Sequence, residues 1–454
     1  MVDKAENEDP SPETPSPFEP ARKAIAKADA TAQRDPRAIE EAIKGFDEAL
    51  ALLDDASLEE GTEKQHLRGW AVMGKANAQV NTHTKEGIEA GIQGYQEALK
   101  HFEAIKEPNP SHLADIAAVW GNIGHTQFRT GQKEALAQAE NCFHQAISIL
   151  EKLPWKENAR FRHQLAATYL NLGNAFARQS NPAKPEVRTI NAFEAALRIL
   201  EDQPVEEFAI GSLVANIRSS VGRALMWSSD KSNLQQAVAS FDETIRVLAK
   251  IKQKDDPRLA MEMASAHANR ANLLSRAQPS KESIQETISS SEFALRIVKG
   301  HEENNLLAAE VSLSARRSLC HAFGLIIGGQ SAEKQQEIHD KASDLLEDGL
   351  KLVKTWESRG ARGLRPSAQH LFHLGCAFYC TQQPHFLPEF VNENLNLEEP
   401  DQVMRESAER TIKEALSRME KADAADSEVA NVLKKTLAKV EAPAPKEEEP
   451  KQEA

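Results

Sequence analysis

Apolar residues recur at spacings of three and four along most of the chain, which is the period that one face of an α-helix requires. Phe143, Ile147 and Leu150 follow this rule, and so do Phe193, Leu197 and Leu200. The alternating runs of Val, Ile and Thr that indicate strands are absent from the sequence. The pattern therefore predicts an all-α protein.

Two signals return together along the chain at steps of 48 to 55 residues. The first is a small residue inside an Ala-rich apolar segment: Gly74, Gly124, Gly173, Gly222, Ala271, Cys320 and Gly375. The second is an aromatic residue followed by a small and an aliphatic residue, at Phe46, Tyr95, Phe143, Phe193 and Phe241, with weaker versions at Ser291 and Leu346. A fixed period of this kind predicts a solenoid in which each unit packs only on its neighbours. We expect each unit to be an antiparallel helix pair, with about eight pairs in all.

Proline and acidic residues separate the chain into expected segments. Residues 1–19 and 441–454 combine proline with charge and hold few apolar residues, so we expect disordered acidic tails at both ends. Residues 20–355 carry the regular repeat. In 356–440 the repeat weakens, and we expect irregular helical repeats that cap the array.

Acidic residues outnumber basic ones by 69 to 55, which gives a net charge of −14 and argues against nucleic-acid binding. Four cysteines in 454 residues do not form a disulfide framework, so a reducing compartment is expected. The N-terminal segment has no apolar stretch typical of a signal peptide, and no apolar run is long enough to cross a bilayer. These features predict a cytoplasmic protein, with attachment to a cytoskeleton or a membrane left open.

The two repeated signals resemble tetratricopeptide repeats. The first-helix signature of that family is matched by Trp120-x-x-Ile123-Gly124, and its second-helix signature by Ala139, Phe143 and Ala146. The resemblance implies a right-handed solenoid with a concave groove lined by the first helices. The family's usual unit has about 34 residues, and the longer units here are most similar to the kinesin light chain branch. Residues 169–175, Tyr-Leu-Asn-Leu-Gly-Asn-Ala, resemble the asparagine-rich first helices of that branch.

The resemblance also implies which positions face the groove: two residues before, one after and five after each small residue. These positions hold amides, imidazoles and guanidiniums, but no Asp or Glu. Amides can hydrogen-bond the backbone of an extended peptide, and guanidiniums can hold carboxylates. We therefore predict a groove that binds an extended acidic segment of a partner protein; the alternative is a solvated inner face that happens to be basic. The predicted groove residues are Asn122, His125, Arg129, Asn171, Asn174, Arg178, Arg223, Asn269, Asn272 and Arg276.

Two other groups of residues each allow a functional and a purely structural interpretation. His370, His373, Cys376 and Cys380 share about a third of a helix circumference, but one segment alone is atypical of a zinc site, so we expect core packing and no metal. A basic and aromatic segment could contact an anionic membrane, and the alternative is a loop whose arginines pair with nearby acids. Its residues are Trp356, Arg359, Arg362, Arg365, Phe386, Leu387 and Phe390.

Motifs for phosphate binding, nucleophilic catalysis or metalloprotease chemistry are absent from the sequence, so neither a catalytic residue nor a cofactor is predicted. The sequence predicts a non-enzymatic scaffold or adaptor. The light-chain resemblance implies an adaptor between tubulin-like filaments and a membrane or cargo. A chaperone-type or signalling scaffold unrelated to the cytoskeleton is the alternative.

Overall fold

The computed structural model describes residues 16–34, 38–55, 57–252, 256–276, 280–382, 384–395, 401–422, 424 and 427–442. The predicted tails therefore lie largely outside the described residues. Over these ranges the structure contains α-helices and short 3₁₀ turns, and its β-structure is a single isolated bridge between Asn181 and Lys184. The all-α prediction is confirmed. The chain divides into two compact units, Met1–Pro204 and Val205–Ala454.

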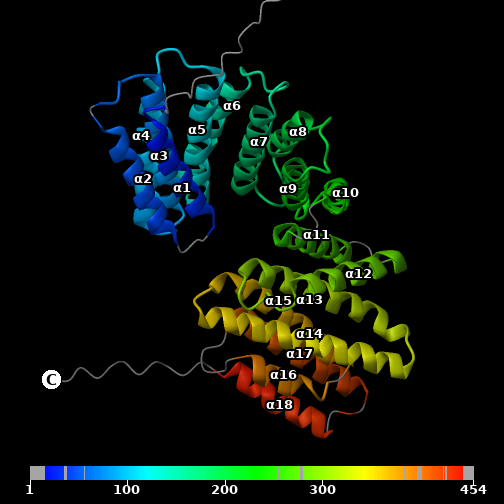
Figure 1. The fold of residues 1–454 in the computed structure, drawn as a ribbon. Helices are drawn as coiled ribbons and strands as arrows, with labels where there is room; N and C mark the ends of the chain where they lie inside the picture. The colour runs from blue at the N-terminus through cyan, green and yellow to red at the C-terminus, as the bar shows by residue number, and fades with distance from the viewer. Residues whose placement is uncertain are drawn as a thin grey trace, which may run out of the picture. The chain divides into compact units, whose positions relative to one another are not determined.

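The first unit contains four antiparallel helix pairs (Figure 1). In chain order its helices are α1 (Glu19–Arg34), α2 (Ile39–Leu53), α3 (Thr62–Val80), α4 (Lys85–Glu103), α5 (Pro110–Thr130), α6 (Lys133–Leu150), α7 (Ala159–Gln179) and α8 (Val187–Ile199). Each odd-numbered helix is the first of its pair, and the Ala-rich segments with small residues fall on these first helices.

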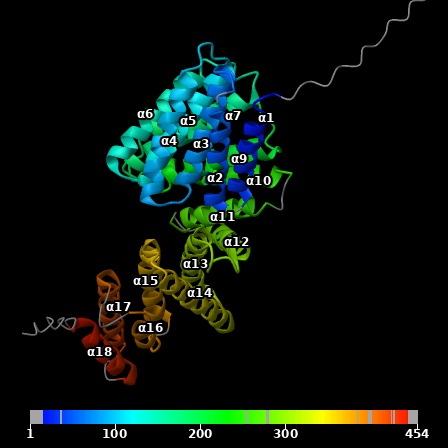
Figure 2. The same cartoon turned by 60° about the vertical axis from the view of Figure 1, so that its left-hand side comes forward.

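The second unit continues the pattern and then becomes less regular. Its helices are α9 (Phe208–Leu225), α10 (Lys231–Lys250), α11 (Pro257–Arg276), α12 (Lys281–Val298), α13 (Leu306–Ile326), α14 (Ala332–Ser358), α15 (Arg365–Gln382), α16 (Leu387–Asn394), α17 (Gln402–Lys421) and α18 (Glu428–Glu441). The pairs α9–α10 and α11–α12 are regular, whereas α14 has 27 residues and α16 only 8. Helix α15 packs on α17, and α18 closes the unit (Figure 2).

A glycine on the first helix lies under an aromatic ring of the second helix of the same pair. A β-carbon placed on Gly124 would come within 2.8 Å of the Phe143 ring, closer than real side chains approach. The same arrangement recurs between Gly173 and Phe193, and between Gly222 and Phe241. The ring of Phe143 belongs to a buried cluster that continues into α7 through residues such as Leu165. The aromatic therefore holds its own pair together and also contributes to the contact with the next pair.

The ends of the array depart from this rule. Gly74 lies under Phe46 of the preceding helix α2, while Phe102 of its own pair covers Gly69. Near the C-terminus, Gly375 lies under Phe390, which comes from the short helix α16. The sequence predicts irregular packing after residue 355 but does not identify the aromatic residue that covers Gly375. The structure identifies that residue as Phe390.

The helix boundaries follow the local sequence. Asn109 caps α5 by accepting a hydrogen bond from the backbone N–H of His112 (3.0 Å), and Pro110 occupies the first helical position, where no N–H is needed. Gly131 ends the same helix with φ of 71°, a left-handed conformation that glycine adopts without steric cost. Proline and glycine therefore fix both ends of a first helix.

Candidate peptide-binding surfaces on the first helices

Three predicted groove residues meet in a hollow between α5 and α7 of the first unit. Asn122, His125 and Asn171 line a space of about 520 Å³, together with Arg160 and His163. Burial lowers the pKa of His125, with a further contribution from Arg129, and burial alone lowers the pKa of His163. Both imidazoles are therefore more easily kept neutral than an ordinary histidine. This hollow offers mainly amide and imidazole groups, which suits hydrogen bonding to a peptide backbone.

A buried carboxylate ties together the first helices beneath this hollow. Asp115 on α5 is 1% exposed, and its Oδ2 accepts hydrogen bonds from His66 Nε2 (2.8 Å) and Trp70 Nε1 (3.0 Å) of α3. Its Oδ1 pairs with Arg160 of α7. Burial alone would raise the pKa of Asp115, but the hydrogen bonds from His66 and Trp70 and the charge of Arg160 hold it below its usual value. The carboxylate thus connects α5 to partners on two other first helices, α3 and α7, and Arg160 is already engaged.

The arginines five residues after the small residues are engaged within the protein. Arg178 Nη1 donates a hydrogen bond to the backbone carbonyl of Phe128 (2.9 Å), and its guanidinium lies over the Phe128 ring at 5.2 Å. Arg129 contacts the His83 imidazole in the turn after α3. In each case the guanidinium reaches the C-terminal end of the preceding first helix, where backbone carbonyls lack helical partners.

Arg276 repeats this arrangement in the second unit. Its Nη1 donates to the carbonyl of Met226 (2.9 Å), 50 residues earlier, and its guanidinium lies 4.3 Å from the centre of the Trp227 ring. Burial lowers the pKa of Arg276. Arg178 and Arg276 therefore cap helix ends and connect successive pairs, in addition to any contact with a partner that the sequence predicts for them.

Arg178 lies against Gly131 at the C-terminal end of α5, so a substitution at Gly131 should change the stability of the protein. A β-carbon there would lie 2.5 Å from Arg178 Nη2, and φ is positive. We expect Gly131→Ala to lower the free energy of unfolding by about 1 to 2 kcal/mol, measured by urea denaturation. Gly121→Ala, in the same helix with no atom within 4 Å of its β-carbon, should instead be neutral or stabilising by up to about 1 kcal/mol. Equal losses in both variants would contradict the cap.

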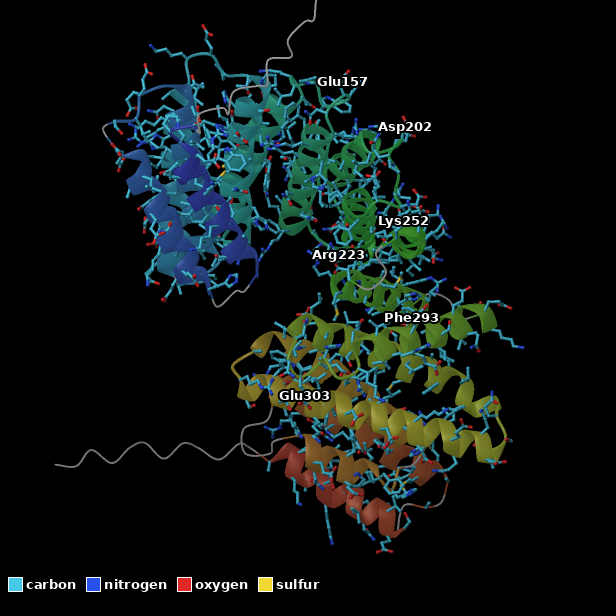
Figure 3. The ribbon with its side chains drawn as sticks, in the orientation of Figure 1. Glu157, Asp202, Arg223, Lys252, Phe293 and Glu303 are labelled. Atoms are coloured by element: carbon cyan, nitrogen blue, oxygen red, sulfur yellow. The ribbon has the colours of Figure 1, made fainter. Side chains whose placement is uncertain are left out.

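Arg223 on α9 is held by its own helix (Figure 3). Its guanidinium donates to the hydroxyls of Ser219 (2.9 Å) and Ser220 (2.7 Å). Burial lowers the pKa of Arg223, and the nearby Glu262 opposes the shift. Burial likewise raises the pKa of Glu262 to about 7, although Arg223 favours its charged form. The Arg223 side chain nevertheless has an exposed surface. Water therefore reaches a guanidinium that is otherwise surrounded by protein.

The remaining predicted amides occupy the same faces of their helices without a shared hollow. Asn174 on α7 and Asn269 on α11 are half-buried, while Asn272 on α11 is 4% exposed. Asn272 lines another hollow, in the second unit, which we call the basic hollow. Its volume is about 720 Å³, and it is lined by Trp227, Asn272, Ser275, Arg276, Arg317, His321, Leu325, His370 and Leu374.

Arg317 is the charged residue of the basic hollow with the fewest partners among the described residues. It is half-buried on α13, and within the described ranges no carboxylate lies in ion-pair distance of it and no acceptor is hydrogen-bonded to it. Burial and the positive charge of Arg276 lower its pKa. Burial also lowers the pKa of His370 to about 4, helped by the charge of Arg317, so this imidazole is neutral at pH 7. The positive charge of the hollow therefore comes from its arginines.

A second hollow of about 540 Å³ continues from His370 towards α17. His373 Nδ1 accepts hydrogen bonds from Ser407 Oγ (2.8 Å) and Arg410 Nη2 (3.2 Å), which assigns the remaining proton to Nε2. Glu406 also lines this hollow, so its charge is mixed. The basic hollow itself has no acidic residue in its lining.

The cysteine and histidine cluster divides between two surroundings. Cys376 and Cys380 are 0% and 5% exposed in the core of the second unit, and burial raises the pKa of both thiols. His370 and His373 line the hollows instead. Across the described part of the chain, no three His, Cys, Asp or Glu side chains are grouped in a way that could hold a metal ion.

Trp356, Arg359 and Arg365 of the predicted membrane segment have partners within the protein. Trp356 Nε1 donates to the carbonyl of Glu302 (2.8 Å), and Arg359 donates to the carbonyl of Glu303. Arg365 pairs with Glu357 at 3.2 Å. The side chain of Arg362 lies outside the described residues.

Of the apolar residues in that segment, one is at the surface. Leu387 is 0% and Phe390 is 4% exposed, whereas Phe386 is 42% exposed. The membrane contact stays a prediction, and among these three Phe386 alone is placed to make it. No helix in the described ranges has the length and apolar character needed to span a bilayer.

The predicted groove residues do not include Arg317, His370 and His373, which line the two hollows of the second unit. His373 stands two residues before Gly375, which is one of the offsets used for the prediction, and could have been found. Arg317 stands three residues before Cys320, a neighbouring position on the same helical face, so a wider window would have included it. The offsets already used reach His373, whereas Arg317 requires one further offset.

Antiparallel helix pairs, with glycines of first helices under aromatic rings, define the chain as a helical-repeat solenoid of the tetratricopeptide-like class. Neither a protein family nor a curated protein matches the chain. Among solved structures it is similar to BtubC (BKLC) from P. vanneervenii, at 15% identity and a TM-score of 0.41, over 61% of this chain and 90% of that one.

Two further solved structures are similar over most of this chain. A Rap protein complexed with competence and sporulation factor is 14% identical, with a TM-score of 0.40, over 93% of this chain and 98% of that one. A signal transduction ATPase with a tetratricopeptide repeat sensor, from Pyrococcus horikoshii, is 13% identical, with a TM-score of 0.40, over 95% of this chain and 62% of that one. Likenesses at these TM-scores support no functional argument.

Proposed function

We propose that this chain is a non-enzymatic protein-binding scaffold that holds an extended acidic segment of a partner protein against its first helices. The observation that carries the proposal is the basic hollow of the second unit. A half-buried Arg317 lies there beside Arg276 with no counter-charge among the described residues. The chain as a whole has a net charge of −14, so a hollow without acidic residues in its lining differs in charge from the rest of the protein.

The lining of the hollow suggests how an acidic segment would bind. A carboxylate can accept two N–H groups of Arg317 at once, because the guanidinium presents its donors in a planar fork. Trp227 and Leu325 are 47% and 43% exposed at the same hollow and would cover an apolar side chain next to the carboxylate. Asn272 supplies an amide for the peptide backbone. An acidic segment with an apolar residue fits this combination.

The hollow of the first unit supports the same mode of binding. Asn122 and Asn171 lie there with neutral imidazoles, and Arg160 already pairs with Asp115. This surface would contact the backbone of an extended segment rather than its charges. The hollow of the first unit would thus bind mainly the peptide backbone, whereas the basic hollow of the second unit would also bind carboxylates through its arginines.

A finer version of the proposal is an adaptor that links tubulin-like filaments to a membrane or cargo. The resemblance of residues 169–175 to the light-chain branch supports it. The alternative is a chaperone-type or signalling scaffold unrelated to the cytoskeleton. Co-sedimentation with polymerised tubulin-like filaments separates the two, because only the adaptor must sediment with them.

The general proposal is tested with a short labelled peptide that carries several glutamates around one leucine. Fluorescence anisotropy should show binding that weakens about tenfold or more as NaCl rises from about 50 to about 300 mM, because salt screens the arginine–carboxylate attraction. The matched peptide with glutamine in place of glutamate should bind far more weakly. Equal affinity for the two peptides at low salt would contradict an acid-binding hollow.

A further inference from the structure

A third hollow of the second unit has the opposite charge to the basic hollow. It lies between α14, α15 and α16 and has a volume of about 530 Å³. Its lining is Gln336, His339, Asp340, Ser343, Asp344, Glu347, Tyr379, Phe386, Glu389, Phe390 and Glu393, which we call the acidic hollow. No residue of it lines the basic hollow. Five carboxylates face one space that contains no Lys or Arg.

The carboxylates of the acidic hollow lack cationic partners among the described lysines and arginines. Asp340 accepts a hydrogen bond from Gln336 Nε2 (2.7 Å), and Glu347 accepts one from Ser343 Oγ (3.1 Å). These donors are neutral. Elsewhere on α14, Glu337 pairs with both Lys334 (2.9 Å) and Lys341 (2.7 Å), so the chain does supply lysines to this helix but not to the hollow.

A buried histidine in the lining is an independent sign of a missing ligand. His339 is 7% exposed, and its Nε2 is covered by protein without a hydrogen-bond partner among the described residues. Its Nδ1 lies 3.5 Å from Asp340 Oδ1, an acceptor that favours a proton on Nδ1; in the neutral ring with that tautomer, Nε2 is the acceptor without a partner. An unpaired buried acceptor costs free energy that a donor from a ligand would recover.

Aromatic rings complete the hollow. The His339 ring lies 5.0 Å from the Phe378 ring and 6.0 Å from the Tyr379 ring, and Phe386 is exposed at the edge. Tyr379 OH and Ser343 Oγ are 2.6 Å apart. Burial raises the pKa of Tyr379, and the charges of Glu347 and Glu393 add to that shift, so these carboxylates are close to the phenol.

We propose that the acidic hollow binds an arginine side chain presented by a basic extended segment of a partner protein. A guanidinium offers five N–H donors for carboxylates and for an unpaired acceptor, and its flat face stacks on aromatic rings. A compact ammonium ion would satisfy the carboxylates but would use the aromatic rings less well. The described acids are not grouped as metal ligands, which favours an organic cation over a metal ion.

This site goes beyond the proposed function and does not depend on it. If both hold, one unit carries two docking sites of opposite charge and can bind two unlike segments. The two sites share α15 but otherwise use different elements: α11, α13 and Trp227, which follows α9, line the basic hollow, whereas α14 and α16 supply most of the acidic one.

The test uses a labelled peptide of alternating glycine and arginine, with both ends blocked. Wild-type protein should bind it in a salt-dependent manner, and the peptide with citrulline in place of arginine should not bind. The double variant Asp344→Asn, Glu389→Gln should weaken binding about tenfold, because two carboxylates are lost from the hollow. The control double variant Glu420→Gln, Glu428→Gln removes the same charge from exposed positions of α17 and α18 and should change affinity less than twofold.

Two outcomes would overturn the proposal. One is equal weakening in both double variants, which would mean that only the net charge attracts the peptide. The other is undiminished binding of the citrulline peptide. The acidic glutamate peptide should bind the Asp344→Asn, Glu389→Gln variant no more weakly than it binds wild type, so a failure of this site is distinguishable from a failure of the basic hollow.

Discussion

Replacing Phe143 by alanine is expected to lower the free energy of unfolding by about 3 to 5 kcal/mol. The ring is 0% exposed, covers Gly124 of its own helix pair and belongs to the cluster shared with α7. Its removal leaves a cavity at the contact of two pairs, where neighbouring side chains can collapse only in part. Urea denaturation followed by circular dichroism measures the loss.

A double-mutant cycle checks that the partner is Gly124. Gly124→Ala alone should cost about 1 to 3 kcal/mol, because its new methyl group would overlap the Phe143 ring. In the Phe143→Ala background that cost should disappear, since the space is then open. A cost of Gly124→Ala that is the same in both backgrounds would show that the ring does not rest on this glycine.

The pairing of helices could be predicted from the sequence because its determinants are local and periodic. Gly124, Gly173 and Gly222 each stand 19 or 20 residues before the aromatic that covers them, and the structure confirms that they lie on first helices. Phe390 is one exception, and Phe46, which precedes the Gly74 that it covers, is another. Phe390 covers Gly375 from the short helix α16, which lies outside the repeat, so spacing alone could not identify it.

The contacts of the arginines could not be predicted in the same way. Arg178 and Arg276 donate to the carbonyls of Phe128 and Met226, each 50 residues earlier. A backbone carbonyl is present at every residue, so nothing in the sequence distinguishes one that will accept a side chain. An arginine at a groove position therefore gives the same sequence signal whether it caps a helix or awaits a ligand. Arg317 differs from both only in having no such acceptor in the described structure.

Reversing the charge of Arg317 is expected to have the largest effect on binding. Arg317→Glu should weaken binding of the acidic peptide by about tenfold to a hundredfold, because a charge-assisted hydrogen bond is replaced by repulsion. The substitution should leave folding intact, since no hydrogen bond or ion pair of the described fold depends on this side chain. Arg276 is less suitable, because it also holds the carbonyl of Met226.

The central claim is that the basic hollow, and not the average charge of the surface, captures acidic segments. Isothermal titration calorimetry of the glutamate peptide against wild type, Arg317→Glu and Arg296→Glu tests it most directly. Arg296 is exposed on the second helix α12, its guanidinium lies over the Phe293 ring without an ion pair among the described residues, and its reversal changes the net charge by the same amount. The account predicts a loss of affinity for Arg317→Glu with near wild-type affinity for Arg296→Glu; equal affinities for the two variants would contradict it.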